Sequence, residues 1–434
     1  MRVPFTKSTL PNGLDVIVHE DHRVPLVAVN VWYHVGSKNE VPGRTGLAHL
    51  FEHLMFEGSE HQRRSYFEPL QEAGASINGS TSADRTNYWE VVPKDAAARA
   101  LWMEADRMGW LLPALTDERF TNQRDVVLNE RRQSYENRPY GLAQFALLAA
   151  IFPPDHPYHW PTIGDPDDLR AASADDARAF FSRFYHPGNA SLCIGGDIDT
   201  GVALDLAARF FGEIPRGAAP ERVEAARPVA RARRIALEDR VELPRLYLAW
   251  PSPALFEPGD AELDLVTDLL ANGRTSRLYE RLTHESRVAT ELAASQGSRE
   301  LGGYVQIVAT AAPGHSLAEL EAAITGELDA LATRGPTSAE LERGRAQAEA
   351  SFVYRLQTLG GFGGRTDQLN AYNTYRKVPD FFDRDLQRYL DASSDALRQA
   401  VGDWLIPSTA VALSVVPQGH LETALAGSEP LTFT

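Results

Sequence analysis

The alternation of apolar and polar residues predicts a strand, a turn and a second strand across residues 9–35. Val16 and Val18 mark the first strand and Gly13 the turn before it. A similar pattern returns at residues 234–250, and a helical apolar segment follows each strand pair. The repetition indicates an internal duplication. We therefore predict an α+β fold of two homologous halves, each a mixed or antiparallel sheet with helices packed on it.

The segment between the two patterns, residues 215–231, is rich in Ala, Pro, Arg and Glu, as is typical of a linker. A chain of 434 residues is too long for one ordinary core. We predict an N-terminal domain at residues 1–214 and a C-terminal domain at residues 232–434, joined by this linker.

The chemistry concentrates in His49-Leu50-Phe51-Glu52-His53, within a predicted apolar helix. His49 and His53 are four residues apart, so they share one helix face and their ring nitrogens can converge on one ion. Burying two imidazoles and the carboxylate of Glu52 without partners would cost several kcal/mol, and a metal ion would satisfy all three. The order H-x-x-E-H is the inverted form of the H-E-x-x-H zinc-peptidase signature.

Catalytic zinc usually has three protein ligands and one open position, so a third ligand is needed. The apolar spacing predicts a helix over residues 117–138 with one face formed by Phe120, Gln123, Val126, Val127 and Glu130. Asp125 and Glu136 fall off that face. The helix pattern alone leaves Glu130 as either a ligand or a surface residue.

These motifs resemble the pitrilysin or insulinase-type (M16) zinc metallopeptidases, especially the short members related to mitochondrial processing peptidase and bacterial heterodimeric homologues. In that family a ligand glutamate follows the two-histidine helix after 76 residues, and 76 residues separate His53 from Glu130 here. The matching segments span the chain: Leu10 to Leu14, Gly46 to Ala48, Gly58, Asn78 to Tyr88, Gly164, Phe184 to Ala190, and Gly196-Asp197.

The resemblance implies one zinc ion per chain, held by His49, His53 and Glu130. Glu52 is then the base that takes a proton from the attacking water and passes it to the leaving amine, although spacing also allows it a ligand role. The start of the segment at residues 78–92 is expected to line the site and pair with the substrate backbone. The residues concerned are Asn78, Gly79 and Ser80, with an ordinary surface hairpin as the alternative.

Two departures from the family pattern affect the expected activity. Gln123 stands where many relatives have a second glutamate that supports the site, and an amide adds no charge there. Thr283 and Thr290 stand where active relatives have an Arg and a Tyr that hold the substrate and the developing oxyanion. We therefore expect a homologous second chain to supply that pair across a shared chamber, as a heterodimer, with a homodimer as the alternative.

The C-terminal half is expected to keep the helix and lack the metal. Aligning Gly58 with Gly273 puts three other residues at the positions of His49, Glu52 and His53, namely Asp264, Thr267 and Asp268.

Composition narrows the partners. The net charge of −16 argues against nucleic acid and anionic membrane and permits a basic peptide. No apolar run is long enough for a membrane span. Cys193, the only cysteine, is expected to be a buried, inert thiol. No secretory signal begins the sequence, so a cytoplasmic location is expected as it stands, or a periplasmic one if a leader was removed.

Taken together, the sequence predicts a zinc-dependent endopeptidase or oligopeptidase that cleaves peptides in an enclosed chamber. The alternative is a non-catalytic structural subunit of the same fold, although such relatives typically lose the ligands that this chain retains. A zinc hydrolase with another substrate class is also compatible with the sequence. The run Gly360-Gly361-Phe362-Gly363-Gly364 lacks the Lys-Ser/Thr ending of a phosphate-binding loop, and we expect a flexible loop or hinge there.

Overall fold

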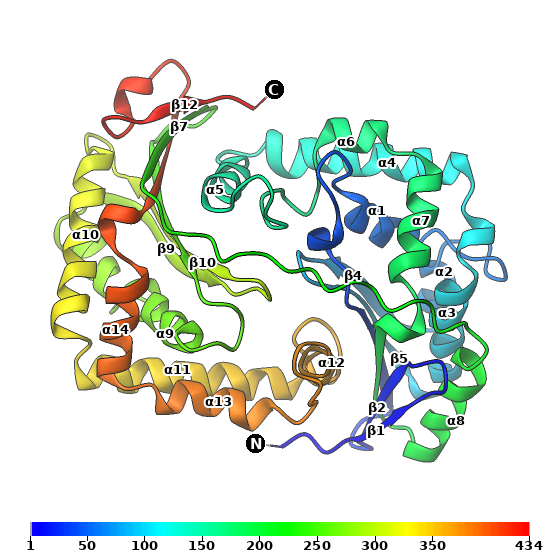
Figure 1. Cartoon of the computed structure of the whole chain (residues 1–434). Helices are drawn as coiled ribbons and strands as arrows, with labels where there is room; N and C mark the ends of the chain where they lie inside the picture. Colours follow the sequence, from blue (N-terminus) through cyan, green and yellow to red (C-terminus); the bar gives the residue numbers. More distant parts are fainter. Residues whose placement is uncertain (1, 434) are drawn as a thin grey trace. The chain divides into compact units, whose positions relative to one another are not determined.

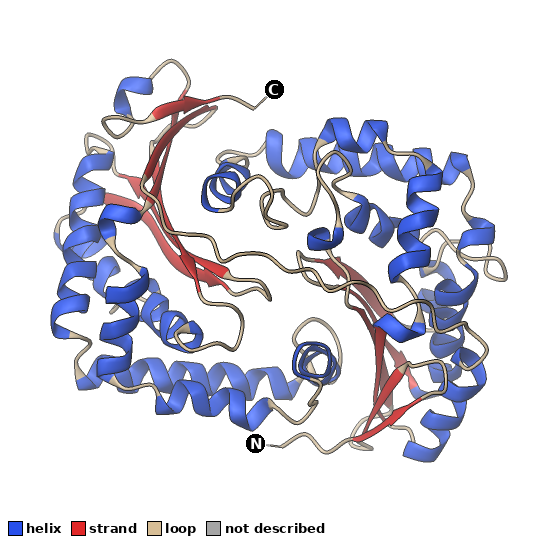
Figure 2. Cartoon of the chain, viewed as in Figure 1, coloured by secondary structure: helices blue, strands red, loops and turns tan. Residues whose placement is uncertain are grey.

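The structure, a computed structural model, describes residues 2–433 and contains two mixed six-stranded sheets with helices (Figures 1 and 2). The predicted α+β class is confirmed. In the first sheet the strand order is β1-β2-β6-β3-β5-β4, in which β2 and β6 are parallel and the other neighbours antiparallel. Its strands are β1 (Thr6–Thr9), β2 (Asp15–Glu20), β3 (Leu26–Tyr33), β4 (Ser76–Thr81), β5 (Thr86–Pro93) and β6 (Ala190–Gly196).

The second sheet repeats this order as β12-β7-β11-β8-β10-β9. Its strands are β7 (Arg233–Asp239), β8 (Arg245–Ser252), β9 (Ala289–Gly297), β10 (Gly303–Ala311), β11 (Val411–Pro417) and β12 (Glu429–Leu431). From β2 to β6 and from β7 to β11 the strands correspond one to one, and a helix follows β3 and β8 alike. The chain is therefore an internal duplication at the level of topology.

The helices of the N-terminal half are α1 (Leu47–Leu54), α2 (Phe67–Glu72), α3 (Ala97–Trp110), α4 (Asp117–Arg131), α5 (Ala143–Ile151), α6 (Pro166–Ala171), α7 (Ala174–Phe184) and α8 (Thr200–Phe211). Those of the C-terminal half are α9 (Asp260–Ala271), α10 (Leu317–Arg334), α11 (Ser338–Gln357), α12 (Arg365–Arg376), α13 (Phe382–Asp391) and α14 (Ser394–Trp404). The predicted helix at residues 117–138 ends as α4 at Arg131 and continues only as a π-helical turn, Arg132–Glu136.

Each compact unit includes a helix from the other half of the sequence. One unit comprises Met1–Arg131, Trp160–Val223 and Ser351–Arg384, and the other comprises Arg132–His159, Glu224–Ala350 and Asp385–Thr434. In the first, α12 packs on β3 and β6, on the opposite face from α3 (Figure 1). In the second, α5 packs on β8 and β11. The predicted linker at residues 215–231 separates the strands of the two sheets. The predicted domain boundaries do not account for the placement of α5 and α12 in the opposite units.

The contact of α12 with the first sheet is largely polar, which explains why hydrophobic pattern did not reveal it. Asn370 Nδ2 donates to Asn30 O at 2.8 Å, and Asn373 Nδ2 donates to Ser191 Oγ at 2.9 Å. Cys193 lies beside this contact in β6, fully buried, and burial raises the pKa of its thiol, in agreement with the predicted inert role. Among residues 2–433, no helix has both the length and the apolarity needed to cross a membrane.

Candidate metal centre

Helix α1 presents both predicted histidines on one face. The side chains of His49 and His53 are 13% and 24% exposed, and their ring centroids lie 4.9 Å apart. The opposite face is fully buried, with Phe51 packed against Phe181 and Tyr185 at centroid distances of 5.5 and 5.3 Å. The apolar residues of the motif therefore anchor the helix and leave the imidazoles toward a partly open side.

Glu130, near the end of α4, lies directly opposite these imidazoles. Its Oε2 is 3.3 Å from His53 Nε2 and 3.8 Å from His49 Nε2. Buried Phe120 and Val127 anchor α4 on the same side as Glu130. Val126 was predicted to share that face but is 46% exposed. The buried face of α4 is therefore narrower than the predicted one. The structure thus brings Glu130 next to two histidines that are distant from it in the sequence.

Two glycines set the relative position of α1 and α4. Gly46, with φ +89°, precedes α1, and a Cβ on Gly164 would lie 2.4 Å from Gly46 Cα. The carbonyl oxygen of Gly164 accepts a 2.7 Å hydrogen bond from Arg131 Nη1. Since Arg131 follows Glu130, this close backbone contact links the start of one ligand helix to the end of the other.

Glu40 caps the N-terminus of α1. Its carboxyl oxygens accept hydrogen bonds from the backbone N–H groups of Gly46, at 2.9 Å, and Ala48, at 2.8 Å. These are among the groups that a helix cannot satisfy internally. Burial raises the pKa of Glu40 to about 8 despite those bonds.

The protonation of His49 and Glu130 suits a divalent cation. Burial lowers the pKa of His49 to about 4, with the neighbouring His53 acting in the same direction, so the ring is neutral near pH 7. The hydrogen bond with His53 lowers the pKa of Glu130. One atom from each residue lies within 4.8 Å of the others. Ligands at zinc-bond lengths in a tetrahedron are roughly 3.4 Å apart, so this donor set fits one zinc ion after small side-chain shifts.

Glu52 lies on α1 beside the two histidines and is hydrogen-bonded to the sheet. Its Oε2 accepts a 2.7 Å hydrogen bond from Thr81 Oγ1, at the end of β4. Burial raises the pKa of the Glu52 carboxyl, and the Thr81 bond acts in the opposite direction. The carboxyl is therefore held in place and has an increased tendency to take up a proton.

The three predicted substrate-binding residues lie on β4, which is an edge strand of its sheet. Gly79 faces α1, and a Cβ there would lie 3.0 Å from Tyr88 and 3.1 Å from Phe56. Asn78 and Ser80 face the other side, where Ser80 Oγ donates to Asn87 Oδ1 at 2.7 Å. Because β5 pairs with only one edge of β4, the other edge has no strand beside it within the sheet.

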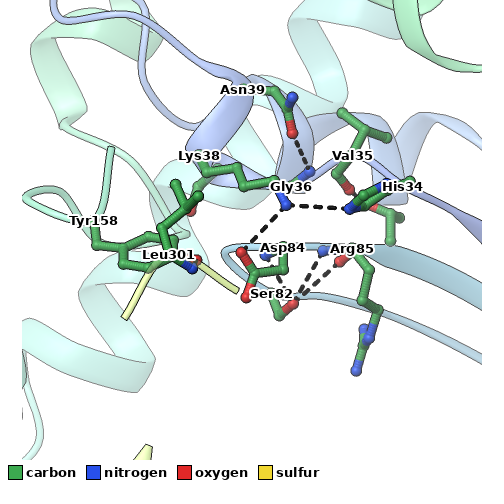
Figure 3. A network of polar contacts seen from close by, with 12 residues as sticks. His34, Val35, Gly36, Lys38, Asn39, Ser82, Asp84, Arg85, Tyr158 and Leu301 are labelled. Atoms are coloured by element: carbon green, nitrogen blue, oxygen red, sulfur yellow. Dashed lines mark hydrogen bonds and ion pairs between the residues drawn. The ribbon is translucent and has the colours of Figure 1, made fainter. Parts of the chain in front are cut away.

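A buried ion pair fixes the turn that follows β4 (Figure 3). Lys38 Nζ lies 3.3 Å from Asp84 Oδ1 and 3.3 Å from His34 Nε2, with only 5% of the lysine side chain exposed. The backbone N–H of Lys38 donates to Ala83 O at 2.9 Å. The loop before α1 and the β4–β5 turn are thereby held together, and Thr81 is kept at the position from which it reaches Glu52.

Gln123 donates from Nε2 to Glu57 Oε1 at 2.7 Å, which connects α4 to the segment after α1. Thr283 lies in the π-helical segment Tyr279–Glu285 and Thr290 in β9, in the second unit. On α9, Asp264 accepts a 2.6 Å hydrogen bond from Tyr389 Oη, and burial raises the pKa of Asp264 to about 7. A structural hydrogen bond thus occupies the position that His49 has on α1.

Sequence reasoning missed the residues that position the site. Thr81 belongs to the polar segment that begins at Asn78. Strand alternation places Thr81 on the face toward α1, and this was the available signal for its contact with Glu52. No comparable signal identifies Lys38 or Arg131, because Asp84 and Gly164 are distant from them in sequence, and the loop between Glu40 and α1 conceals its capping role.

Comparison with known proteins places this architecture in a family. The model of Insulinase (Peptidase family M16) matches residues 15–159, and that of the Peptidase M16 inactive domain matches residues 171–348. Zinc protease PqqE of Helicobacter pylori is 28% identical over 400 residues, covering 90% of this chain and 88% of that protein. The mitochondrial-processing peptidase subunit beta of Blastocladiella emersonii is 26% identical over 221 residues, 50% of this chain and 46% of that protein.

The crystal structure of a protease from Helicobacter pylori superposes with a TM-score of 0.87 at 25% sequence identity, covering 96% of this chain and 100% of that one. The sequence, the duplicated sheets and the second half without the motif histidines agree with one another. The chain belongs to peptidase family M16, the insulinase family.

Proposed function

We propose that this chain is a zinc-dependent endopeptidase or oligopeptidase. One zinc ion would be held by His49, His53 and Glu130, with Glu52 as the catalytic base. The observation that carries this proposal is the convergence of one atom from each of the three residues within 4.8 Å, on and beside the helix that bears Glu52. The relatives named as zinc proteases support the same assignment.

A zinc ion supplies a Lewis acid that activates water and polarises the peptide carbonyl. The Glu52 carboxylate accepts the proton of the attacking water and delivers it to the leaving nitrogen. Burial favours the protonated intermediate state of Glu52, and Thr81 keeps one of its oxygens in a fixed orientation. The hydrogen bond from Gln123 to Glu57 helps to position α4, and the neutral amide adds no charge to the site.

The substrate in this proposal is an extended peptide that adds to the free edge of β4. Asn78, Gly79 and Ser80 would pair with its backbone, since an edge strand offers unpaired N–H and C=O groups. Gly79 allows the rings of Phe56 and Tyr88 to pack closely against β4 on the α1 face.

A homologous second chain completes the proposed enzyme as a heterodimer that encloses the site in a chamber. The basis is the pair Thr283 and Thr290, whose side chains cannot supply the cationic and phenolic donors of active relatives. Thr290 Oγ1 instead bonds Thr310 O within its own sheet, at 3.4 Å. Mixing the chain with its homologous companion is expected to increase peptide cleavage, and equal rates for the chain alone would refute the requirement.

The proposal is tested by measuring zinc content and peptide cleavage for the wild type and Glu52→Gln, with the exposed Glu60→Gln as a matched control. Glu52→Gln should keep zinc and lose cleavage, whereas the control should keep both. Wild-type protein that binds no zinc and cleaves no peptide, with or without its companion, would favour the structural-subunit alternative.

A further inference from the structure

The glycine-rich loop between α11 and α12 lies directly on the first sheet. A Cβ on Gly360 would lie 2.6 Å from Val91 Cγ2 and 2.7 Å from Ala28 Cβ, so only glycine permits this approach. Gly361 has φ +83° and Gly363 has φ +73°, in the left-handed region. Gly360 thus serves close packing, Gly361 and Gly363 serve the left-handed backbone, and the loop predicted to be flexible or a hinge contacts the sheet directly.

A buried carboxylate fastens this loop to the strands beneath it. Asp367 Oδ2 accepts from Gly363 N at 2.8 Å, while Oδ1 accepts from Trp32 Nε1 at 2.8 Å and Asn87 Nδ2 at 2.9 Å. Asp367 is only 7% exposed. The loop therefore has a defined position relative to β3 and β5.

The fastened loop presents an aromatic ring that remains half exposed. Phe362 is 50% exposed, and its ring packs edge-on against Trp89 with centroids 5.5 Å apart and an interplanar angle of 87°. Trp89 Nε1 is buried and has no hydrogen-bond partner among the described residues, so hydrogen bonding does not account for a tryptophan here. The two rings form an apolar aromatic pair on a loop that has a defined position.

The strand register places this aromatic pair on the same sheet face as residues of the proposed peptide-binding edge strand. Trp89 on β5 pairs with Asn78 on β4, so both side chains lie on the same face of the sheet. On that face β4 carries the short polar side chains of Ser76, Asn78 and Ser80. A peptide strand added to β4 would direct every second side chain to this face.

We propose that Trp89 and Phe362 form a subsite for a large apolar or aromatic side chain of the substrate, on the sheet face opposite to α1. This inference rests on the proposed function. Successive side chains of the bound peptide point to opposite faces of the sheet, so the residue in this subsite alternates with the residues that point toward the metal ligands. The glycine-rich loop then becomes a determinant of cleavage specificity.

The cleavage test uses a synthetic library of unstructured peptides and mass spectrometry of the products. The enzyme, with its companion chain where cleavage requires it, should prefer a large apolar residue at one position near the cleaved bond. Phe362→Ala should lower kcat/KM roughly tenfold for those peptides and leave peptides with alanine at that position nearly unchanged. Trp102→Ala, a partly exposed tryptophan on α3, is the control and should retain the wild-type profile. An unchanged profile for Phe362→Ala overturns the subsite.

A binding measurement separates this inference from the proposed function. Glu52→Gln, alone and combined with Phe362→Ala, is titrated with a peptide that carries one phenylalanine within a Gly/Ser sequence, and with the same peptide carrying alanine there. The subsite predicts tighter binding of the phenylalanine peptide to Glu52→Gln, and loss of that difference in the double variant. Equal affinities, or no binding of either peptide, overturn the subsite. Failure of zinc binding and cleavage in the wild type would instead refute the proposed function.

Discussion

Thr81 Oγ1 donates a 2.7 Å hydrogen bond to Glu52 Oε2 and thereby joins the edge strand β4 to the helix α1. Thr81 ends the same strand as the proposed peptide-binding residues Asn78 and Gly79. The proposed base is thus held by the strand that would bind the peptide, so the position of the substrate backbone and the orientation of Glu52 depend on one element.

Removing that hydrogen bond should reduce catalysis without removing the metal. Thr81→Val keeps the shape of the side chain and deletes the donor, so kcat should fall roughly ten- to one-hundredfold, as expected for one hydrogen bond to a charged group. Zinc content should stay at the wild-type level. Thr81→Ser, which retains the hydroxyl, serves as the control and should remain close to the wild type. Equal kcat values for the Val and Ser variants would contradict the role given to Thr81.

The pair of Lys38 and Asp84 should be important for folding because it is buried. Lys38→Met removes the cation opposite a carboxylate that is 7% exposed, and we expect a loss of about 3–5 kcal/mol in the free energy of unfolding. Denaturant unfolding measures this loss. The matched control is Lys94→Met, because Lys94 pairs with Asp197 at 3.1 Å while 52% exposed, so its loss should change the free energy of unfolding much less. Similar losses for the two variants would contradict the prediction.

Asp264 should make stability depend on pH. Its folded-state pKa of about 7 exceeds the value of about 3.9 for an unfolded chain, so folding takes up a proton between those pH values. Stability contributed through this group therefore decreases as pH rises from about 4 to about 7.

Asp264→Asn keeps an acceptor for Tyr389 and removes the titration, so its free energy of unfolding should fall less over this range than that of the wild type. Urea unfolding at several pH values measures the difference. The exposed Asp403→Asn is the control and should follow the wild type. Parallel curves for Asp264→Asn and the wild type would show that burial does not shift this carboxyl.

Zinc should stabilise the folded protein through Glu130. Zinc at about a thousand times its dissociation constant contributes about 4 kcal/mol, which corresponds to a Tm increase of roughly 10 °C for a unit of this size. Glu130→Gln should lose most of that increase, whereas Glu118→Gln, an exposed substitution on the same helix, should keep it. A calorimetric scan with and without zinc tests this, and an equal increase in both variants would exclude Glu130 as a ligand.

The sequence contains enough information for the duplicated sheets because strand alternation is a local property. It also identifies α1, since His49 and His53 share a face by helix geometry alone. Glu130 required the family spacing, because the periodicity of α4 gave a wider buried stripe than the structure has: Val126 is 46% exposed. The local hydrophobic pattern thus identifies helices and strands. It does not determine which side chain on a helix face contacts a residue that is distant in the sequence.

The exchanged helices could not be deduced from periodicity. The interface of α12 relies on Asp367, Asn370 and Asn373, which read as surface residues in a sequence because their partners on β3, β5 and β6 are far away in the chain. For the same reason the glycine-rich loop gave a prediction of flexibility, although Gly360 is required by the close approach to Ala28 and Val91.

The most direct test of the metal centre is a crystal structure of the protein grown with zinc, with anomalous scattering recorded on both sides of the zinc absorption edge. The account predicts one zinc peak per chain, bonded to His49, His53 and one carboxylate oxygen of Glu130. A Glu130 side chain directed away from the two imidazoles, with no zinc peak between α1 and α4, would contradict it.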